Sequence, residues 1–143
     1  MRRLLAALIV VTVPVAAQGP ASPEAARGVI ESYYAAIDRG GFRAAYLCWD
    51  RGGAASGKSY AAFRAGFART ARTQVTTYAP TDREGTAGSS FITVPVDVRA
   101  TLKSGARQHF RGSYVLRRVN DVDGSSPAQR RWHIASARLV AVR

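Results

Sequence analysis

The stretch 22–50 constrains the fold of this chain most, because it has the pattern of two helices separated by a glycine pair. Ser22 followed by Pro23 is typical of a helix start, since the serine hydroxyl accepts from a free N–H and proline has no N–H to lose. Gly40 and Gly41 are expected to end this helix. Apolar side chains recur at three- and four-residue intervals in the first helix, at Ala26, Val29, Ile30, Tyr33, Tyr34 and Ile37. The same rhythm returns in a second, shorter helix, at Phe42, Ala45, Tyr46 and Trp49.

The second half of the chain alternates apolar and polar residues, which indicates antiparallel strands with one buried face. The clearest case has four inward side chains, Ile92, Val94, Val96 and Val98. Pro95 within this run predicts an edge position or a bulge, and Gly112 predicts a bend in the next strand. The segment 80–90 is rich in turn residues and is expected to be a connection. We therefore predict a sheet of four strands, at 74–79, 91–102, 108–119 and 130–142.

The segment YYAAIDRGGF at 33–42, followed by Ala45 and Tyr46, resembles the start of the NTF2-like superfamily, also called SnoaL-like or cystatin-like α+β cones. More loosely, the resemblance extends over 22–142 through the order of helices and strands. It implies an α+β fold in which three N-terminal helices pack in the concave face of a strongly bent antiparallel sheet. Similar folds often pair through their sheets, so a homodimer of this kind is one expectation.

The first residues have the pattern of an export signal. Met1-Arg2-Arg3 is a positive region, Leu4–Val13 an apolar region, and Val15-Ala16-Ala17 a cleavage site of small residues. We predict a signal peptide over 1–17, a single domain over 18–143, and a periplasmic or secreted location. No membrane-spanning segment is expected after signal removal, because the apolar run is shorter than the roughly 20 residues that a span needs. A buried N-terminal strand or an uncleaved anchor is the alternative.

The chain is strongly basic, with a net charge of +12 that comes almost entirely from arginine. Such a field attracts polyanions. In an exported protein these would be envelope lipids, lipopolysaccharide or acidic glycans, and nucleic acid is not expected. A solvated face that reflects only composition is the alternative interpretation. The candidate anion surface lies on the strands, at Arg99, Arg111, Arg117 and Arg131.

Two motifs suggest cofactor chemistry but lack the context that it needs. Residues 52–59 match the P-loop pattern G-x-x-x-x-G-K-[ST], but the segment before them is helical and no βαβ units follow. We expect a flexible loop instead, with Ser59 capping a third helix over 59–70. Asp121, Asp123 and Gly124 resemble part of a calcium loop whose closing glutamate is replaced by Trp132. A hairpin turn is the prediction there, and neither a cofactor nor a metal site is expected.

Catalytic groups are also scarce. Both histidines, His109 and His133, share strand parity with arginines and are expected on the outer face, away from Cys48. We therefore predict a non-catalytic binding domain. It would take a small apolar ligand inside the cone, or an envelope protein or polyanion on the basic sheet face. The candidate pocket is lined by Tyr33, Trp49, Phe67 and Tyr114, with Asp50 as the acid near its mouth.

The family resemblance also implies an enzymatic alternative. Some NTF2-like proteins are ketosteroid isomerases or polyketide cyclases that stabilise an enolate with a tyrosine of the first helix, and Tyr33 matches that position. Such chemistry also requires a carboxylate inside the cone. Asp97 is expected to point outward, so no inward acid is evident on the strands. The simpler interpretation is that Tyr33 is a core residue with a satisfied hydroxyl.

Overall fold

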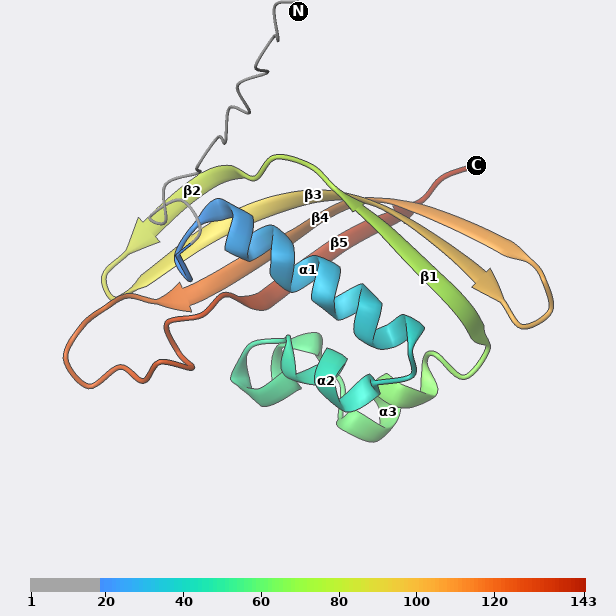
Figure 1. The fold of residues 1–143 in the computed structure, drawn as a ribbon, viewed down its shortest axis with the longest axis horizontal. Helices are drawn as coiled ribbons and strands as arrows, with labels where there is room; N and C mark the ends of the chain where they lie inside the picture. Colours follow the sequence, from blue (N-terminus) through green and yellow to red (C-terminus); the bar gives the residue numbers. More distant parts are fainter. Residues whose placement is uncertain (1–18) are drawn as a thin grey trace, which may run out of the picture.

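The structure is a computed structural model that describes residues 19–143, apart from the side chains of Asp82 and Arg83. The predicted signal peptide over 1–17 therefore lies outside the described residues. The fold is α+β, with short helices first and one antiparallel sheet of five strands after them (Figure 1). The helical elements are α1 (Pro23–Asp38), α2 (Phe42–Leu47), the 3₁₀ helix η2 (Arg51–Ser56) and α3 (Tyr60–Ala65). The strands are β1 (Thr70–Thr77), β2 (Thr81–Thr86), β3 (Ser89–Leu102), β4 (Arg107–Val119) and β5 (His133–Ala141).

The fifth strand is β2, which lies within the segment that the sequence predicted to be a turn-rich connection. Both β1 and β2 pair with β3, β1 along its second half and β2 along its first. The sheet then continues from β3 to β4 and β5. The prediction of four strands was wrong because the sequence of β2, TDREGT, contains no apolar alternation. Its glycine and its polar residues from Glu84 onward are exposed, so its place in the sheet depends on backbone pairing.

Pro95 occupies the point on β3 where β1 has ended and β2 has not yet begun. Thr77 of β1 pairs with Val96, and Thr81 of β2 pairs with Thr93. No residue of β1 or β2 therefore pairs with Pro95. The carbonyl of Pro95 accepts instead from the backbone N–H of Tyr78 at 3.0 Å. The predicted edge position was wrong, because β3 is an internal strand. The missing N–H of Pro95 nevertheless faces the gap that β1 and β2 leave in the ladder.

The helices cover one face of the curved sheet, with α1 lying diagonally across its hollow side (Figure 1). The predicted alternation of β3 is confirmed, because all four inward side chains are buried: Ile92, Val94, Val96 and Val98. Tyr114 and Leu116 of β4 bury the same face. None of the helices in residues 19–143 is both long and apolar enough to span a membrane.

Both ends of the first helical region are tied to β5 or to the residue just before it. The hydroxyl of Ser22 caps α1 by accepting from Ala25 N at 3.0 Å, as predicted, and the Ser22 carbonyl accepts from Trp132 Nε1 at 3.1 Å. Beyond α2, the backbone pairs with the start of β5: Ile134 N donates to Cys48 O and Asp50 N donates to Ile134 O, both at 2.8 Å. These bonds fix where the chain after α2 meets the sheet.

The segment that matches the P-loop pattern lies between two helices, in η2 and the turn after it. It therefore has no strand feeding the glycine turn, and the nucleotide interpretation is excluded by topology. The loop is also less free than expected, since Asp50 caps η2 and Tyr46 Oη donates to Lys58 O at 2.8 Å. Ser59 caps the third helix as predicted, but that helix ends at Ala65 rather than at Thr70.

Gly112 of β4 pairs with Leu139 of β5 and lies close to the β5 backbone. A Cβ atom at this position would be 1.8 Å from the carbonyl oxygen of Arg138 on β5. The two strands also change register between Val115 and Leu116. Gly112, which the sequence predicted to lie at a bend, thus lies at a contact between β4 and β5 that leaves no room for a Cβ atom.

Candidate functional site

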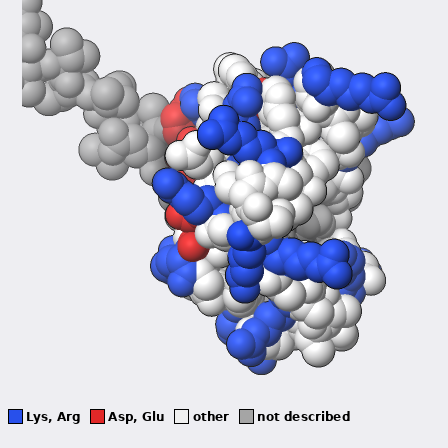
Figure 2. Space-filling model, turned by 90° about the vertical axis from the view of Figure 1, so that its right-hand side faces the viewer, with Lys and Arg blue, Asp and Glu red and all other residues white. Residues whose placement is uncertain are grey.

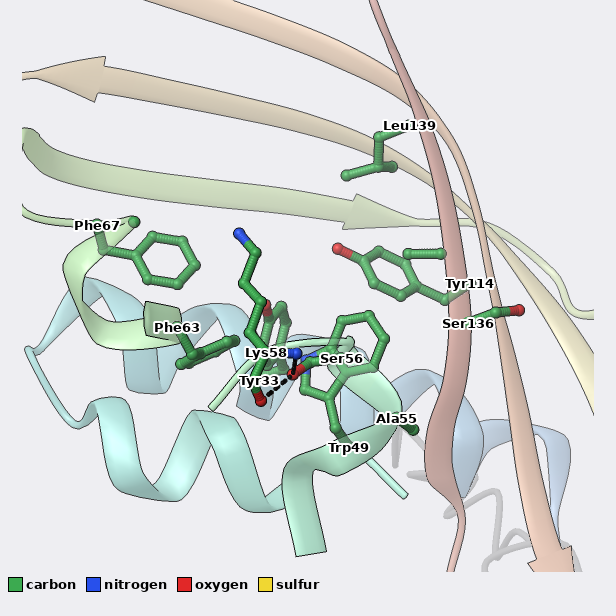
Figure 3. Close-up of a pocket in the computed structure, with 12 residues that line it drawn as sticks. Tyr33, Trp49, Ala55, Ser56, Lys58, Phe63, Phe67, Tyr114, Ser136 and Leu139 are labelled. Carbon is green, nitrogen blue, oxygen red and sulfur yellow. Dashed lines mark hydrogen bonds between the residues drawn. The ribbon is translucent and has the colours of Figure 1, made fainter. Parts of the chain in front are cut away.

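The aromatic hollow lies between the helices and the strands β4 and β5, and its volume is about 540 Å³. Four of the five predicted pocket residues line it: Tyr33 from α1, Trp49 after α2, Phe67 after α3, and Tyr114 from β4 (Figure 3). The other lining side chains come from the loop before α3, from α3 and from β5, and include Ser56, Lys58, Phe63, Ser136 and Leu139. A neighbouring hollow of about 330 Å³ shares Tyr33, Phe67 and Tyr114 with it.

Aromatic rings form the inner wall of this hollow. The rings of Tyr33, Trp49 and Tyr114 are mutually edge-on, with centroids 6.1 to 6.3 Å apart. Phe63 lies 6.3 Å from Tyr33 and 5.2 Å from Phe67, which extends the wall toward α3. Edge-to-face contacts at these distances stabilise the cluster beyond simple burial. The wall is therefore a packed surface, and the hollow is the space that these rings leave open toward β5.

Two of the buried phenols are engaged with each other. The hydroxyls of Tyr34 and Tyr114 share a buried hydrogen bond between α1 and β4. Burial raises the pKa of Tyr34 to about 12, partly offset by this hydrogen bond. Burial also raises the pKa of Tyr114, and the neighbouring tyrosines Tyr34 and Tyr33 raise it further. Both groups are therefore neutral hydrogen-bonding phenols at ordinary pH.

The hydroxyl of Tyr33 has the indole N–H of Trp49 as its nearby polar partner, although the pair does not reach the geometry of a normal hydrogen bond. Burial raises its pKa, and the nearby indole N–H of Trp49 offsets part of that rise. This N–H belongs to a side chain that is 9% exposed, and among the described residues it is the one buried side-chain polar atom without a partner. A buried N–H without a hydrogen-bond partner costs roughly 1–3 kcal/mol of desolvation.

Lys58 is the main lining residue that the sequence did not predict, since its only motif was the misleading P-loop match. Figure 3 shows its side chain extending across the hollow, with the ammonium between Phe67 and Tyr114. A Cβ atom at Gly66 would lie 3.8 Å from Nζ, so the ammonium reaches the turn after α3. Within the described residues Lys58 forms no ion pair, and no acidic residue lines the hollow.

Asp50, the fifth predicted pocket residue, is not in the aromatic hollow. Its side chain turns outward, accepting from Arg51 N at 3.0 Å and from Arg117 Nη1 at 3.1 Å. It lines a different hollow together with Arg117 and Arg131. The prediction failed because Asp50 N pairs with Ile134 on β5, which places the residue at the sheet edge rather than at the pocket mouth.

The predicted anion surface divides into two parts. Arg99 and Arg111 lie beside Asp97 on the outer face of the sheet, with His109 Nε2 2.7 Å from the Asp97 carboxylate and Arg111 Nε 3.0 Å from it. The hydrogen bond from His109, followed by that from Arg111, lowers the pKa of Asp97. Arg117 and Arg131 instead share the outer hollow with Asp50. In the view of Figure 2, Lys and Arg cover much of the surface and acidic atoms gather near one edge.

Catalytic sets of the usual kinds do not assemble in the described residues. Within 19–143 no three His, Cys, Asp or Glu side chains lie close enough together to hold a metal ion. His109 Nε2 lies 2.7 Å from Asp97 Oδ2 and His133 Nδ1 lies 3.0 Å from the carbonyl of Arg131, and within the described residues neither histidine is hydrogen-bonded to a serine or cysteine side chain. Burial raises the pKa of Cys48, which disfavours the thiolate.

Comparison with known proteins does not identify a family for this chain. No protein-family model matches the chain, and neither a curated protein nor a solved structure is significantly similar to it.

Proposed function

We propose that this protein is a non-catalytic binding domain of the NTF2-like type whose aromatic hollow takes a small organic acid with an apolar body. The observation that carries the proposal is the combination of aromatic walls with unpartnered donors and no acid. Among the described residues Trp49 Nε1 has no hydrogen-bond partner, Lys58 reaches into the same space, and none of the lining residues is Asp or Glu.

The apolar part of such a ligand matches the walls. A volume of about 540 Å³ lies within the usual range for small-molecule sites, roughly 300–1,000 Å³. Tyr33, Phe63, Phe67 and Tyr114 present ring edges and faces against which a flat or aliphatic body packs. Leu139 of β5 closes the opposite side (Figure 3).

The acidic end of the ligand matches the donors. A carboxylate near Lys58 gains a charge-assisted hydrogen bond, which is about twice as strong as a neutral one. The hydroxyl of Tyr33 is a neutral donor beside it, because its raised pKa keeps it protonated. A cationic ligand would meet the lysine ammonium with no carboxylate to balance it, so the site selects against positive charge.

The isomerase or cyclase alternative is less well supported. Proton transfer at carbon needs a carboxylate facing Tyr33 within the hollow. The two acids considered from the sequence lie elsewhere: Asp50 pairs with Arg117, and Asp97 pairs with His109 and Arg111 on the outer face. Tyr33 alone would supply an oxyanion donor without the group that moves the proton.

Two features support the NTF2-like assignment within this proposal. Helices come first in the chain and strands after them, and the helices cover the hollow side of a curved antiparallel sheet (Figure 1). The ligand would lie between the two layers, as the position of the aromatic hollow suggests. Export by the predicted signal peptide would place this binding domain in the periplasm or outside the cell.

The test compares two probes with the same ring and opposite charge, 1-naphthoate and 1-naphthylmethylamine, by isothermal titration calorimetry. We expect naphthoate to bind more tightly, and Lys58→Met to weaken it about 10- to 100-fold, as expected for loss of a charged hydrogen bond. Lys103→Met is the matched control, because Lys103 is the only other lysine and lies in the exposed β3–β4 turn. Equal binding of the amine, or no effect of Lys58→Met, would refute the proposal.

A further inference from the structure

A second hollow, the arginine hollow, lies at the other side of the segment that follows α2. It has a volume of about 510 Å³ and is bordered by Arg51 at the start of η2, Arg117 near the end of β4, and Arg131 just before β5. Asp50 supplies one carboxylate, and Leu47 and Val119 supply apolar surface. Three arginines from three separate segments therefore border one surface depression that contains a single acid among its described lining residues.

One of these guanidinium groups is held in place and the other two are free. Arg117 donates from Nε to Ser89 Oγ at 3.2 Å and from Nη1 to Asp50 Oδ2 at 3.1 Å, so its orientation is fixed while Nη2 keeps its hydrogens. Within the described residues the side chains of Arg51 and Arg131 make no hydrogen bond and no ion pair. The arginine hollow thus has two guanidinium groups whose N–H donors are unused and a third, that of Arg117, whose orientation is already fixed.

The backbone at Arg51 is a second, independent indication of use. Its φ is 55°, in the left-handed region that disfavours any residue with a Cβ, and it is the only non-glycine residue with positive φ among those described. The next two residues, Gly52 and Gly53, also have positive φ and bear no such cost. Glycine would adopt this φ without the steric cost, so the Arg51 side chain stands at a position that the backbone disfavours. Strain of this kind is concentrated at functional sites.

The geometry points to a binding site for a phosphate or sulfate monoester whose ester group rests on the apolar edge. Arginine forks bind tetrahedral oxyanions through paired, charge-assisted hydrogen bonds. Leu47 is 50% exposed at the rim, where an organic group on the ester oxygen would cover it. Asp50 acts as a positioning residue, because it orients Arg117 and caps η2 through Arg51 N.

The experiment measures binding of phenyl phosphate to the full chain at low salt, with Arg131→Gln and Arg51→Gly as variants. Both are expected to weaken binding about tenfold or more, as expected for loss of one charged hydrogen-bonding partner. Arg51→Gly should also leave the melting temperature unchanged or raise it, since it relieves the backbone. Arg107→Gln is the matched control, because it removes the same charge from the exposed first residue of β4 and should change affinity less than twofold.

Further arms separate the sources of the anion and the two sites. Vesicles of phosphatidylcholine with phosphatidate show whether a lipid headgroup is accepted, and inorganic phosphate shows how much the organic group adds. Weakening in Arg131→Gln and Arg51→Gly with either organophosphate supports the site. Phenyl phosphate is also an organic anion that the aromatic hollow would accept, so Arg131→Gln and Arg51→Gly are measured again in the Lys58→Met background, where weakening by the arginine changes tests this site separately from the aromatic hollow. Equal weakening in Arg107→Gln, or unchanged affinity in both site variants, would overturn the inference.

Discussion

The hydrogen bond between Tyr34 and Tyr114 can be tested by a double-mutant cycle. Both hydroxyls are buried, with Tyr34 6% and Tyr114 2% exposed, and they pair α1 with β4 below the aromatic hollow. Tyr34→Phe or Tyr114→Phe alone removes one hydroxyl and leaves the other buried without a partner. The double variant removes both and leaves an apolar contact of the same shape.

The expected magnitudes follow from that asymmetry. Each single change should lower the free energy of unfolding by about 1.5 kcal/mol, within the roughly 1–3 kcal/mol cost of a stranded buried polar group. The double change should cost only about 1 kcal/mol, which gives a coupling of about 2 kcal/mol between the two sites. For a domain of this size, each single variant should melt about 6 °C lower.

The assay is urea unfolding followed by tryptophan fluorescence, with Tyr78→Phe as the control. Tyr78 is 51% exposed, so its substitution should stay within about 0.5 kcal/mol of the parent. Additive single and double effects, or neutral single variants, would refute the reasoning. The result also bears on the hollow, because a Tyr114 hydroxyl engaged by Tyr34 is not free to donate to a ligand, whereas Tyr33, Trp49 and Lys58 are among the donors that remain.

Four further predictions concern stability. Gly112→Ala places a Cβ 1.8 Å from the Arg138 carbonyl oxygen; β5 must shift, and calorimetry should show a loss of about 3 kcal/mol or more from overpacking and broken ladder bonds. Gly28→Ala, with no atom within 4 Å of the new methyl, should instead stabilise α1 by about 0.5–1 kcal/mol. The raised pKa of Tyr34, about 12, means that its contribution is present below the unfolded pKa of about 10 and is lost as pH rises toward 12. The difference in absorbance at 295 nm between the parent and Tyr34→Phe should therefore show the Tyr34 phenolate only as circular dichroism reports unfolding, and a difference that appears near pH 10 in the folded chain would contradict this. The lowered pKa of Asp97 contributes stability above its unfolded pKa that is lost as pH falls. Urea midpoints should thus decline more steeply below about pH 5 in the parent than in Asp97→Asn.

The fold was predictable where burial dictates the pattern. The alternation from Ile92 to Val98 and the helical stripe through Ile30 and Tyr33 each bury one face, so a shift of one residue would expose the whole set. β2 gave no such signal, because its polar residues from Glu84 onward are exposed. Its pairing with β3 depends on backbone atoms, which every residue has, and periodicity cannot detect it.

The site was predictable to the same extent. Tyr33, Trp49 and Tyr114 belong to buried faces, so their meeting in one wall follows from the periodicity and the layering. Asp50 and Lys58 belong to the segment between α2 and α3, whose path depends on single backbone contacts. The bond from Asp50 N to Ile134 O and that from Tyr46 Oη to Lys58 O decide which hollow each side chain enters. Neither hydrogen bond can be predicted from the composition of the chain or from the spacing of its residues.

Those contacts make the segment 50–58 the divider between the two hollows. Asp50 and Arg51 border the arginine hollow, whereas Ser56 and Lys58 border the aromatic one. Tyr46 holds the divider at two points: its ring packs where a Gly53 Cβ would be, at 2.2 Å, and its hydroxyl donates to Lys58 O at 2.8 Å.

Gly53→Ala should consequently act on stability and on binding together. The new methyl displaces the Tyr46 ring and, at φ 102°, also strains the backbone, so we expect a loss of about 3 kcal/mol. With Tyr46 displaced, Lys58 loses its anchor, and naphthoate affinity should fall about tenfold in calorimetry. Gly57→Ala is the matched control, because its φ is 75° but no atom lies within 4 Å of the new methyl. It should cost about 1–2 kcal/mol of backbone strain and leave affinity within twofold. Equal effects of the two alanines on naphthoate binding would show that Tyr46 does not position Lys58. The Lys58 side chain would then reach the aromatic hollow without being held there by Tyr46.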